Sequence, residues 1–188
     1  MLLQMLSKYP GEARVHYLLG NLEFVDRKPA AALEAYGEAL RLDPGLRGDA
    51  AILLNVRTLL DDRDKELAWD ALTLTTQRIG APAARTLAAM GTEDRRPEFR
   101  MAARTACGDL RCLDRIDLVK SYSLDLSQAK TCDEKREAVK RLASTKGPKT
   151  IEALKKARQV RGAFGGLLGG GNDCVRKDID AALKDLGG

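Results

Sequence analysis

The sequence predicts an all-α fold in which helical repeats continue into an irregular helical solenoid. The 188 residues are rich in Ala, Leu, Arg, Lys, Glu and Asp, and only 4% of them are aromatic. This composition favours helices packed through small and aliphatic side chains over a β-sheet. Part of the N-terminal pattern also recurs with a period of about 34 residues, which is typical of stacked helical hairpins.

The clearest repeat covers residues 13–44. Gly20 and Ala32 are small residues placed where two antiparallel helices can cross closely, and Tyr36 is placed to fill the space beside them. Pro44 is expected to end the second helix, because proline lacks the backbone donor that a helix needs. The spacing therefore predicts one helical hairpin over this segment.

This hairpin resembles a tetratricopeptide repeat. Counted from Ala13, positions 7, 8, 20, 24, 27 and 32 match the pattern of that family and hold Leu19, Gly20, Ala32, Tyr36, Ala39 and Pro44. His16 and Glu23 depart from the pattern, because the family has Trp and Tyr at these two positions. The resemblance implies an array of helical hairpins that binds another protein.

Weaker copies of the repeat flank this hairpin. Pro10 precedes Pro44 by one repeat period, so residues 2–9 are expected to end a preceding helix, and the chain is expected to begin within a repeat of a longer protein. A degenerate repeat follows, with a helix, a turn and a second helix expected at 47–60, 61–64 and 65–79. The sequence thus predicts tetratricopeptide repeats over residues 1–82, one clear and one degenerate.

Residues 83–188 are predicted to form a helical C-terminal subdomain. Its expected helices cover residues 83–90, 97–107, 111–129, 131–145, 149–160 and 172–186. Gly91 is expected to stop the first helix, and Thr131 with Glu134 forms a capping box that opens the fourth. A Gly-rich loop at 162–171 connects the last two helices. It is not a phosphate loop, because no Lys-Ser/Thr follows it and no strand precedes it.

Leucine and cysteine residues form a further pattern in the C-terminal half, made by Leu124–Lys135, Leu154 and Cys174–Arg176. This pattern resembles the C-terminal region of multidomain bacterial serine/threonine protein kinases, in which tetratricopeptide repeats follow the kinase domain. The sequence contains no Val-Ala-x-Lys, His-Arg-Asp or Asp-Phe-Gly motif. The resemblance therefore implies the regulatory part of a bacterial signalling kinase and not its catalytic domain.

The available side chains disfavour an enzyme, a metal site and a cofactor. His16 is the only histidine, so it would have to serve any His-based metal site or catalytic triad alone. The four cysteines include no CxxC pair. We therefore expect a non-enzymatic domain without metal or cofactor, whose partner is a protein or peptide rather than a small-molecule substrate.

One face of the first helices is a candidate peptide-binding groove. Asn21 and Asn55 occupy equivalent positions one repeat period apart, and an amide can both donate to and accept from an extended peptide. Arg14, Tyr17 and Phe24 share the helix face of Asn21. Carboxylate clamps have a lysine where Tyr17 stands, so a peptide backbone or helix is favoured over a terminal carboxylate. The alternative is two surface asparagines that coincide by chance.

The second candidate is a basic patch. The net charge is +5, and the segment 135–161 holds ten basic and two acidic residues. The candidate residues are Lys135, Lys140, Arg141, Lys155 and Lys156. They would bind an acidic protein, a nucleic acid or an anionic membrane surface, although ordinary solvated helix faces give the same pattern. Nucleic acid is disfavoured, because no aromatic residue that could stack on bases lies between Tyr122 and Phe164.

The cysteines suggest crosslinks. Cys107 and Cys112 flank a short turn, and a bond between Cys132 and Cys174 would close the Gly-rich loop. Three connectivities are open, and reduced, buried thiols are the alternative to all of them. Disulfides would favour an extracytoplasmic domain of a membrane-anchored protein, whereas free thiols would favour the cytoplasm. No apolar run approaches the ~18 residues of a membrane span, so no membrane insertion is expected in this segment.

Overall fold

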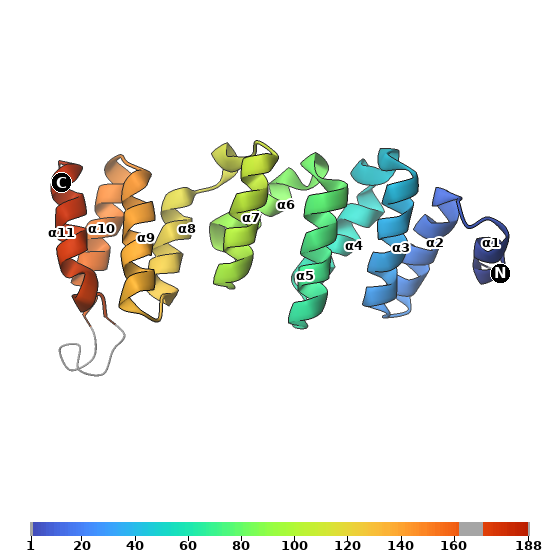
Figure 1. Ribbon diagram of the computed structural model, residues 1–188, viewed down its shortest axis with the longest axis horizontal. Helices are drawn as coiled ribbons and strands as arrows, with labels where there is room; N and C mark the ends of the chain where they lie inside the picture. Colours follow the sequence, from blue (N-terminus) through green and yellow to red (C-terminus); the bar gives the residue numbers. More distant parts are fainter. Residues whose placement is uncertain (1, 162–170, 188) are drawn as a thin grey trace. The chain divides into compact units, whose positions relative to one another are not determined.

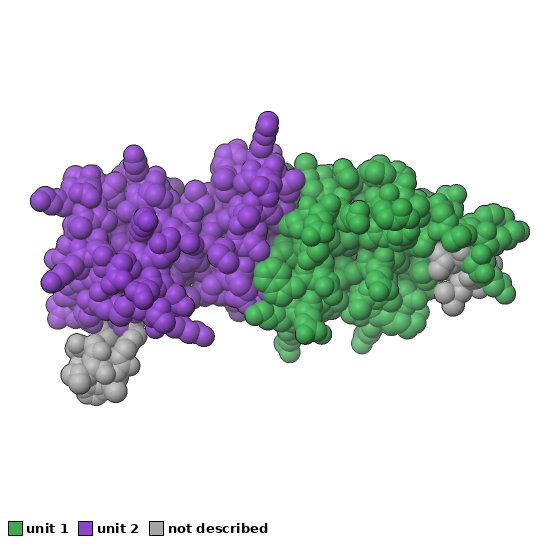
Figure 2. Space-filling model, viewed as in Figure 1, with its two compact units in different colours: residues 1–86 green, residues 87–188 purple. Residues whose placement is uncertain are grey.

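The structure is a computed structural model that describes residues 2–161 and 171–187 (Figure 1). Every regular element in these two ranges is a helix, and they contain no strand, which confirms the predicted all-α class. None of the helices described is long and apolar enough to cross a membrane. The chain divides into two compact units, residues 1–86 and 87–188 (Figure 2). The sequence predicts this division slightly earlier, after residue 82.

The first unit is built from helical hairpins. Its α-helices are α1 (Leu2–Lys8), α2 (Ala13–Val25), α3 (Pro29–Leu42), α4 (Ala50–Leu60) and α5 (Lys65–Leu74). Helices α2 and α3 lie side by side and antiparallel (Figure 1). Gly20 lies against the ring of Tyr36, so closely that a Cβ at this position would lie 2.6 Å from two ring carbons. The small and large residues therefore meet as the spacing predicts.

Aspartate caps set the start of the next two helices. A helix is expected from Arg47, but a 3-10 turn occupies Pro44–Gly48 and α4 begins only at Ala50. The cause is Asp49, whose Oδ1 accepts hydrogen bonds from the backbone N–H groups of Ala51 at 3.0 Å and Ile52 at 3.1 Å. Asp64 caps α5 in the same way. After α5 the chain widens into one π-helical turn, Thr75–Ile79.

The second unit continues the helical pattern. Its α-helices are α6 (Ala84–Glu93, which begins in the first unit), α7 (Pro97–Asp109), α8 (Leu118–Gln128), α9 (Cys132–Ser144), α10 (Pro148–Gln159) and α11 (Arg176–Asp185). The expected stop at Gly91 is wrong, because α6 runs through this residue. A Cβ at Gly91 would lie 2.7 Å from Cδ1 of Ile116, so the glycine permits close packing. The start expected at Arg111 is also wrong, because Asp117 caps α8.

The predicted capping box at the start of α9 is confirmed. The hydroxyl of Thr131 accepts from the backbone N–H of Glu134 at 3.1 Å, and the Glu134 carboxylate accepts from the backbone N–H of Thr131 at 3.1 Å. The N–H of Lys130 donates to the same carboxylate at 2.7 Å. These backbone donors lower the pKa of Glu134. Helix α9 therefore has a fixed start, and Cys132 is its first residue.

A buried charge cluster joins α7 to α8. The Arg100 side chain is fully buried and binds the carboxylate of Asp125, which also accepts from Arg104 at 2.7 Å. Arg104 donates to the hydroxyl of Ser121, which in turn donates to the carbonyl of Gly91. In the same unit, α8, α9, α10 and α11 share one apolar core that includes Leu126, Leu142, Leu154, Ile179 and Leu183.

Candidate functional site

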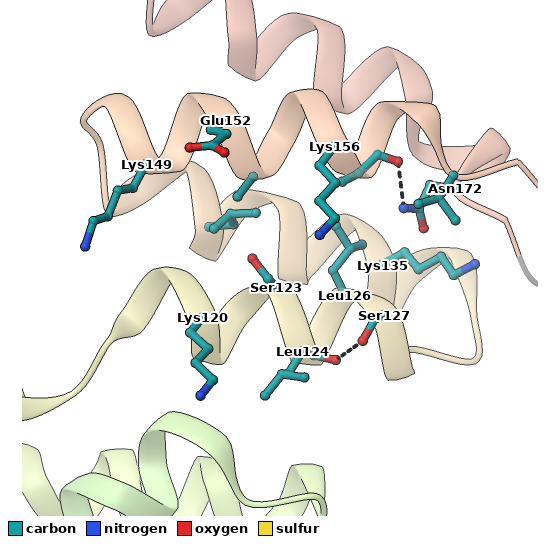
Figure 3. A pocket seen from close by; sticks show the side chains of 14 residues that line it. Lys120, Ser123, Leu124, Leu126, Ser127, Lys135, Lys149, Glu152, Lys156 and Asn172 are labelled. Carbon is teal, nitrogen blue, oxygen red and sulfur yellow. Dashed lines mark hydrogen bonds between the residues drawn. The ribbon is translucent and has the colours of Figure 1, made fainter.

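A groove of about 490 Å³ lies in the second unit between α8 and α10 (Figure 3). These two helices form its walls, and α9 contributes Lys135 and Leu142. The floor is apolar, because Leu126 and Leu142 belong to the packed core of the unit. A floor that is part of the core is held in place before any ligand binds. The groove is therefore preformed.

Lysine side chains stand on both rims of the groove. Lys120 lies on α8, and Lys149 and Lys156 lie on α10 (Figure 3). Lys120 forms an ion pair with Glu93, whereas within the described ranges no acidic side chain pairs with Lys149 or Lys156. Glu152 lies on α10 between these two lysines and is the one acidic residue in the lining that the structure describes. The α10 rim thus offers two unpaired ammonium groups to a ligand.

The serine hydroxyls of the groove are already engaged by their own helix. Ser123 Oγ donates to the carbonyl of Val119 at 2.7 Å, and Ser127 Oγ donates to the carbonyl of Leu124 at 2.9 Å. Because each hydroxyl has only one proton, neither can donate to a ligand without breaking a bond inside α8. Strong polar recognition in this groove therefore falls to the lysines.

One end of the groove is held by several hydrogen bonds. The backbone N–H of Asn172 donates to the carbonyl of Val160 at 3.0 Å, and its side-chain Nδ2 donates to the carbonyl of Ala157 at 2.9 Å (Figure 3). The ammonium of Lys135 donates to the carbonyl of Gly171. Lys135 is only 7% exposed, so its role is to hold this segment.

The five residues of the predicted basic patch do not form one patch. Lys135 is buried and donates to the carbonyl of Gly171, and Lys156 lines the groove. Lys155 lines a separate depression beside α11, while Arg141 binds Glu137 at 3.0 Å. Lys140, the fifth, is exposed on α9 and does not line the groove. The physical reason is helical geometry, because neighbouring residues point about 100° apart around a helix.

Both expected disulfides are present. Cys107 binds Cys112 across the turn after α7, and Cys132 at the start of α9 binds Cys174. The four cysteines are all bonded in the described part of the chain. Cys107 and Cys112 are buried, whereas Cys132 and Cys174 are exposed. The second bond fixes the segment after the Gly-rich loop, and of that loop only Gly171 is among the residues described.

In the first unit the structure brings the predicted amides together around a residue that the sequence assigned to packing. The hydroxyl of Tyr36 donates to Oδ1 of Asn21 at 2.8 Å, and Nδ2 of Asn55 donates to the Tyr36 hydroxyl at 2.6 Å. Burial raises the pKa of Tyr36. The guanidinium of Arg14 lies 5.2 Å from the centre of the Tyr17 ring. The two amides therefore have partners within the unit, and α2, α3 and α4 meet at this cluster.

Phe24, the fifth residue of the predicted face, is half-buried at the end of α2. The hydroxyl that links the amides could not be inferred from the sequence, because the repeat pattern requires only an aromatic ring where Tyr36 stands. The groove in the second unit could not be inferred from the sequence either. Its walls come from two helices with a third between them in the sequence, and its floor is the core itself.

Other known proteins do not supply a function for the groove. The sequence matches no protein-family model, no curated protein and no solved structure. In the ranges 2–161 and 171–187, no group of three or more His, Cys, Asp or Glu side chains is placed to hold a metal ion. What the groove can bind follows from its apolar floor and its lysine rims.

Proposed function

We propose that the chain is a non-enzymatic protein-interaction domain that binds a segment of a partner protein in the groove between α8 and α10. The observation that carries this proposal is the combination of an apolar floor, drawn from the core, with exposed lysines on the rims. Such a surface resembles the centre and rim of a protein interface, where an apolar anchor is buried and charges surround it.

The wider role that we propose is recruitment or scaffolding within a bacterial signalling kinase or a related multidomain protein. Two features support a tetratricopeptide relationship. Gly20 packs directly on Tyr36 in the α2–α3 hairpin. Asn21 and Asn55, which are one repeat period apart, converge on the hydroxyl of that tyrosine. The leucine and cysteine pattern of the C-terminal half supports the kinase relationship.

The second candidate function is binding of a more general anionic partner, such as an acidic protein, a nucleic acid or a membrane surface. The unpaired Lys149 and Lys156 favour it. The distribution of the other basic residues over several faces favours a localised ligand instead, because a polyanion gains from many charges on one surface.

A selection from a displayed library of random 16-residue peptides, with the full chain immobilised, tests the proposal. We expect enriched peptides whose Kd rises at least tenfold with Val160→Glu, which places a carboxylate at the end of the groove. Val25→Glu is the matched control, because Val25 is another exposed valine at the end of a helix. Selected peptides that all bind both variants equally, or a failure to enrich any peptide, would contradict the proposal.

A further inference from the structure

We infer that the segment bound in this groove is an acidic amphipathic helix of the partner protein, read by Lys149 and Lys156. The inference rests on the proposed function and adds to it the conformation and the charge of the ligand. Three observations carry it. The polar groups on the walls are already hydrogen-bonded within their own helices, the two lysines are spaced along α10, and the α10 rim is exposed.

The walls favour a helical ligand over an extended one. Both walls are helices, so their backbone groups already bond within α8 and α10. The hydroxyls of Ser123 and Ser127 also donate to their own helix. An extended peptide would bring unpaired N–H and C=O groups to walls that cannot satisfy them. A helix satisfies its own backbone and presents only side chains, so it suits this groove.

The spacing of the lysines sets the charge pattern of the ligand. Lys149 and Lys156 are seven residues apart, which places them about 10.5 Å apart along α10 at a rise of about 1.5 Å per residue. A ligand helix lying along α10 meets both with carboxylates seven residues apart on one edge. Glu152 lies between them, so the ligand position opposite Glu152 suits a basic or amide side chain. Lys120 on the other rim is paired with Glu93 and contributes less.

The exposed rims favour a helix over a lipid. Lys149, Glu152, Lys156 and Val160 are all exposed along the α10 rim, so the groove is open on that side. A fatty acid would leave much of its chain in water there, whereas small-molecule sites bury most of their ligand. A single carboxylate would also engage only one of the two lysines. A helix needs only one face covered, and its apolar stripe matches the floor formed by Leu126 and Leu142.

The test uses three labelled 18-residue peptides titrated against the full chain with its disulfides intact. The first has a leucine stripe at helical spacing with glutamates beside it, the second has lysines in place of the glutamates, and the third scrambles the first. We expect the acidic amphipathic peptide to bind at least tenfold more tightly than the other two and to gain helical circular dichroism on binding.

Charge reversal assigns the lysines. The double variant Lys149→Glu/Lys156→Glu should bind the acidic peptide at least tenfold more weakly and the basic peptide more tightly than the native chain does. The control is Lys155→Glu/Lys184→Glu, which changes the net charge by the same amount. Its two residues lie on α10 and α11 and line a separate depression. The Kd of the acidic peptide for this control should change by no more than about twofold, since exposed charges outside the contact are largely screened.

Equal binding of the acidic peptide and its scrambled form would overturn the inference, and so would an equal loss of affinity in both double variants. Displacement of library-selected peptides by dodecanoate, with no binding of the acidic helix, would assign the groove to a lipid instead. Selected peptides that depend on the groove but are neutral or basic contradict this inference alone. The absence of any groove-dependent peptide contradicts the proposed function as well.

Discussion

Asn55 donates a hydrogen bond from Nδ2 to the hydroxyl of Tyr36 at 2.6 Å and so ties α4 to the α2–α3 hairpin. The same hydroxyl donates to Asn21 at 2.8 Å. One phenol group thus links three helices of the first unit. The two asparagines, which the sequence marks as ligand-binding residues, consequently also contribute to stability.

Removing that hydroxyl with Tyr36→Phe should lower the free energy of unfolding by about 1–3 kcal/mol, because two half-buried amides lose their bonds to the phenol and keep only the longer one between Asn55 Nδ2 and Asn21 Oδ1 at 3.4 Å. Urea denaturation followed by circular dichroism measures the change. Tyr17→Phe is the control, since within the described structure no hydrogen bond joins the Tyr17 hydroxyl to another residue, and it should cost much less. Equal effects of the two variants would show that the cluster adds nothing to stability.

The same residue should make stability depend on alkaline pH. Burial raises the pKa of Tyr36 in the folded chain above its ordinary value of 10.0. The stabilisation that the Tyr36 hydroxyl contributes is therefore complete below pH 10.0 and is lost as the pH rises through the pKa of Tyr36 in the folded chain. The difference in unfolding free energy between the native chain and Tyr36→Phe should shrink above that pH. A difference that stays constant up to pH 12 would contradict this assignment.

Filling the contact between α2 and α3 should also destabilise the first unit. A Cβ at Gly20 would lie 2.6 Å from the Tyr36 ring, so Gly20→Ala should cost about 1–3 kcal/mol through overpacking. At Gly48 no atom lies within 4 Å of an added Cβ. Gly48→Ala should therefore leave the urea midpoint nearly unchanged. A neutral Gly20→Ala would mean that the hairpin can relax at no cost.

In the second unit, Asp125 balances two buried arginines. Asp125→Ala leaves Arg100 and Arg104 buried without their carboxylate, which should cost about 3–5 kcal/mol. Asp180→Ala removes the exposed pair with Arg158 and should barely shift the denaturation midpoint. If both variants unfold at the same urea concentration, Asp125 does not stabilise the second unit in this way.

The two disulfides should differ in their response to a reductant. Cys132 and Cys174 are exposed, whereas Cys107 and Cys112 are buried, so a dithiol reaches the Cys132–Cys174 bond sooner. Mass spectrometry after timed alkylation should find Cys132 and Cys174 labelled first. The Cys132–Cys174 bond spans 42 residues, and its loss in Cys132→Ser/Cys174→Ser should cost about 4 kcal/mol at most. Earlier labelling of Cys107 would contradict the exposure argument.

Local signals in the sequence account for most of the helices. Asp64, Thr131 and the prolines at helix starts act within one turn, so their effects can be inferred from spacing alone. The expected helix boundaries are wrong where tertiary contacts determine the end of a helix. Helix α6 runs through Gly91, where Ile116 occupies the space that a side chain would fill, and this contact is invisible in the sequence.

The candidate site could be predicted only in part. The segment 135–161 is basic in the sequence, but which lysines share a groove depends on how α8, α9 and α10 pack. Lys155 and Lys156 are neighbours in the chain and yet line different depressions. The apolar floor could not be inferred either, because its residues also satisfy the pattern of an ordinary helical core.

Backbone deuterium exchange of the full chain, with and without a saturating library-selected peptide, tests the central claim most directly. Binding in the groove should protect amides of α8 and α10, residues 118–128 and 148–159, and leave α2 and α3 unchanged. Protection concentrated in α2 and α3, with none in α8 or α10, would contradict the account and place the binding face in the first unit.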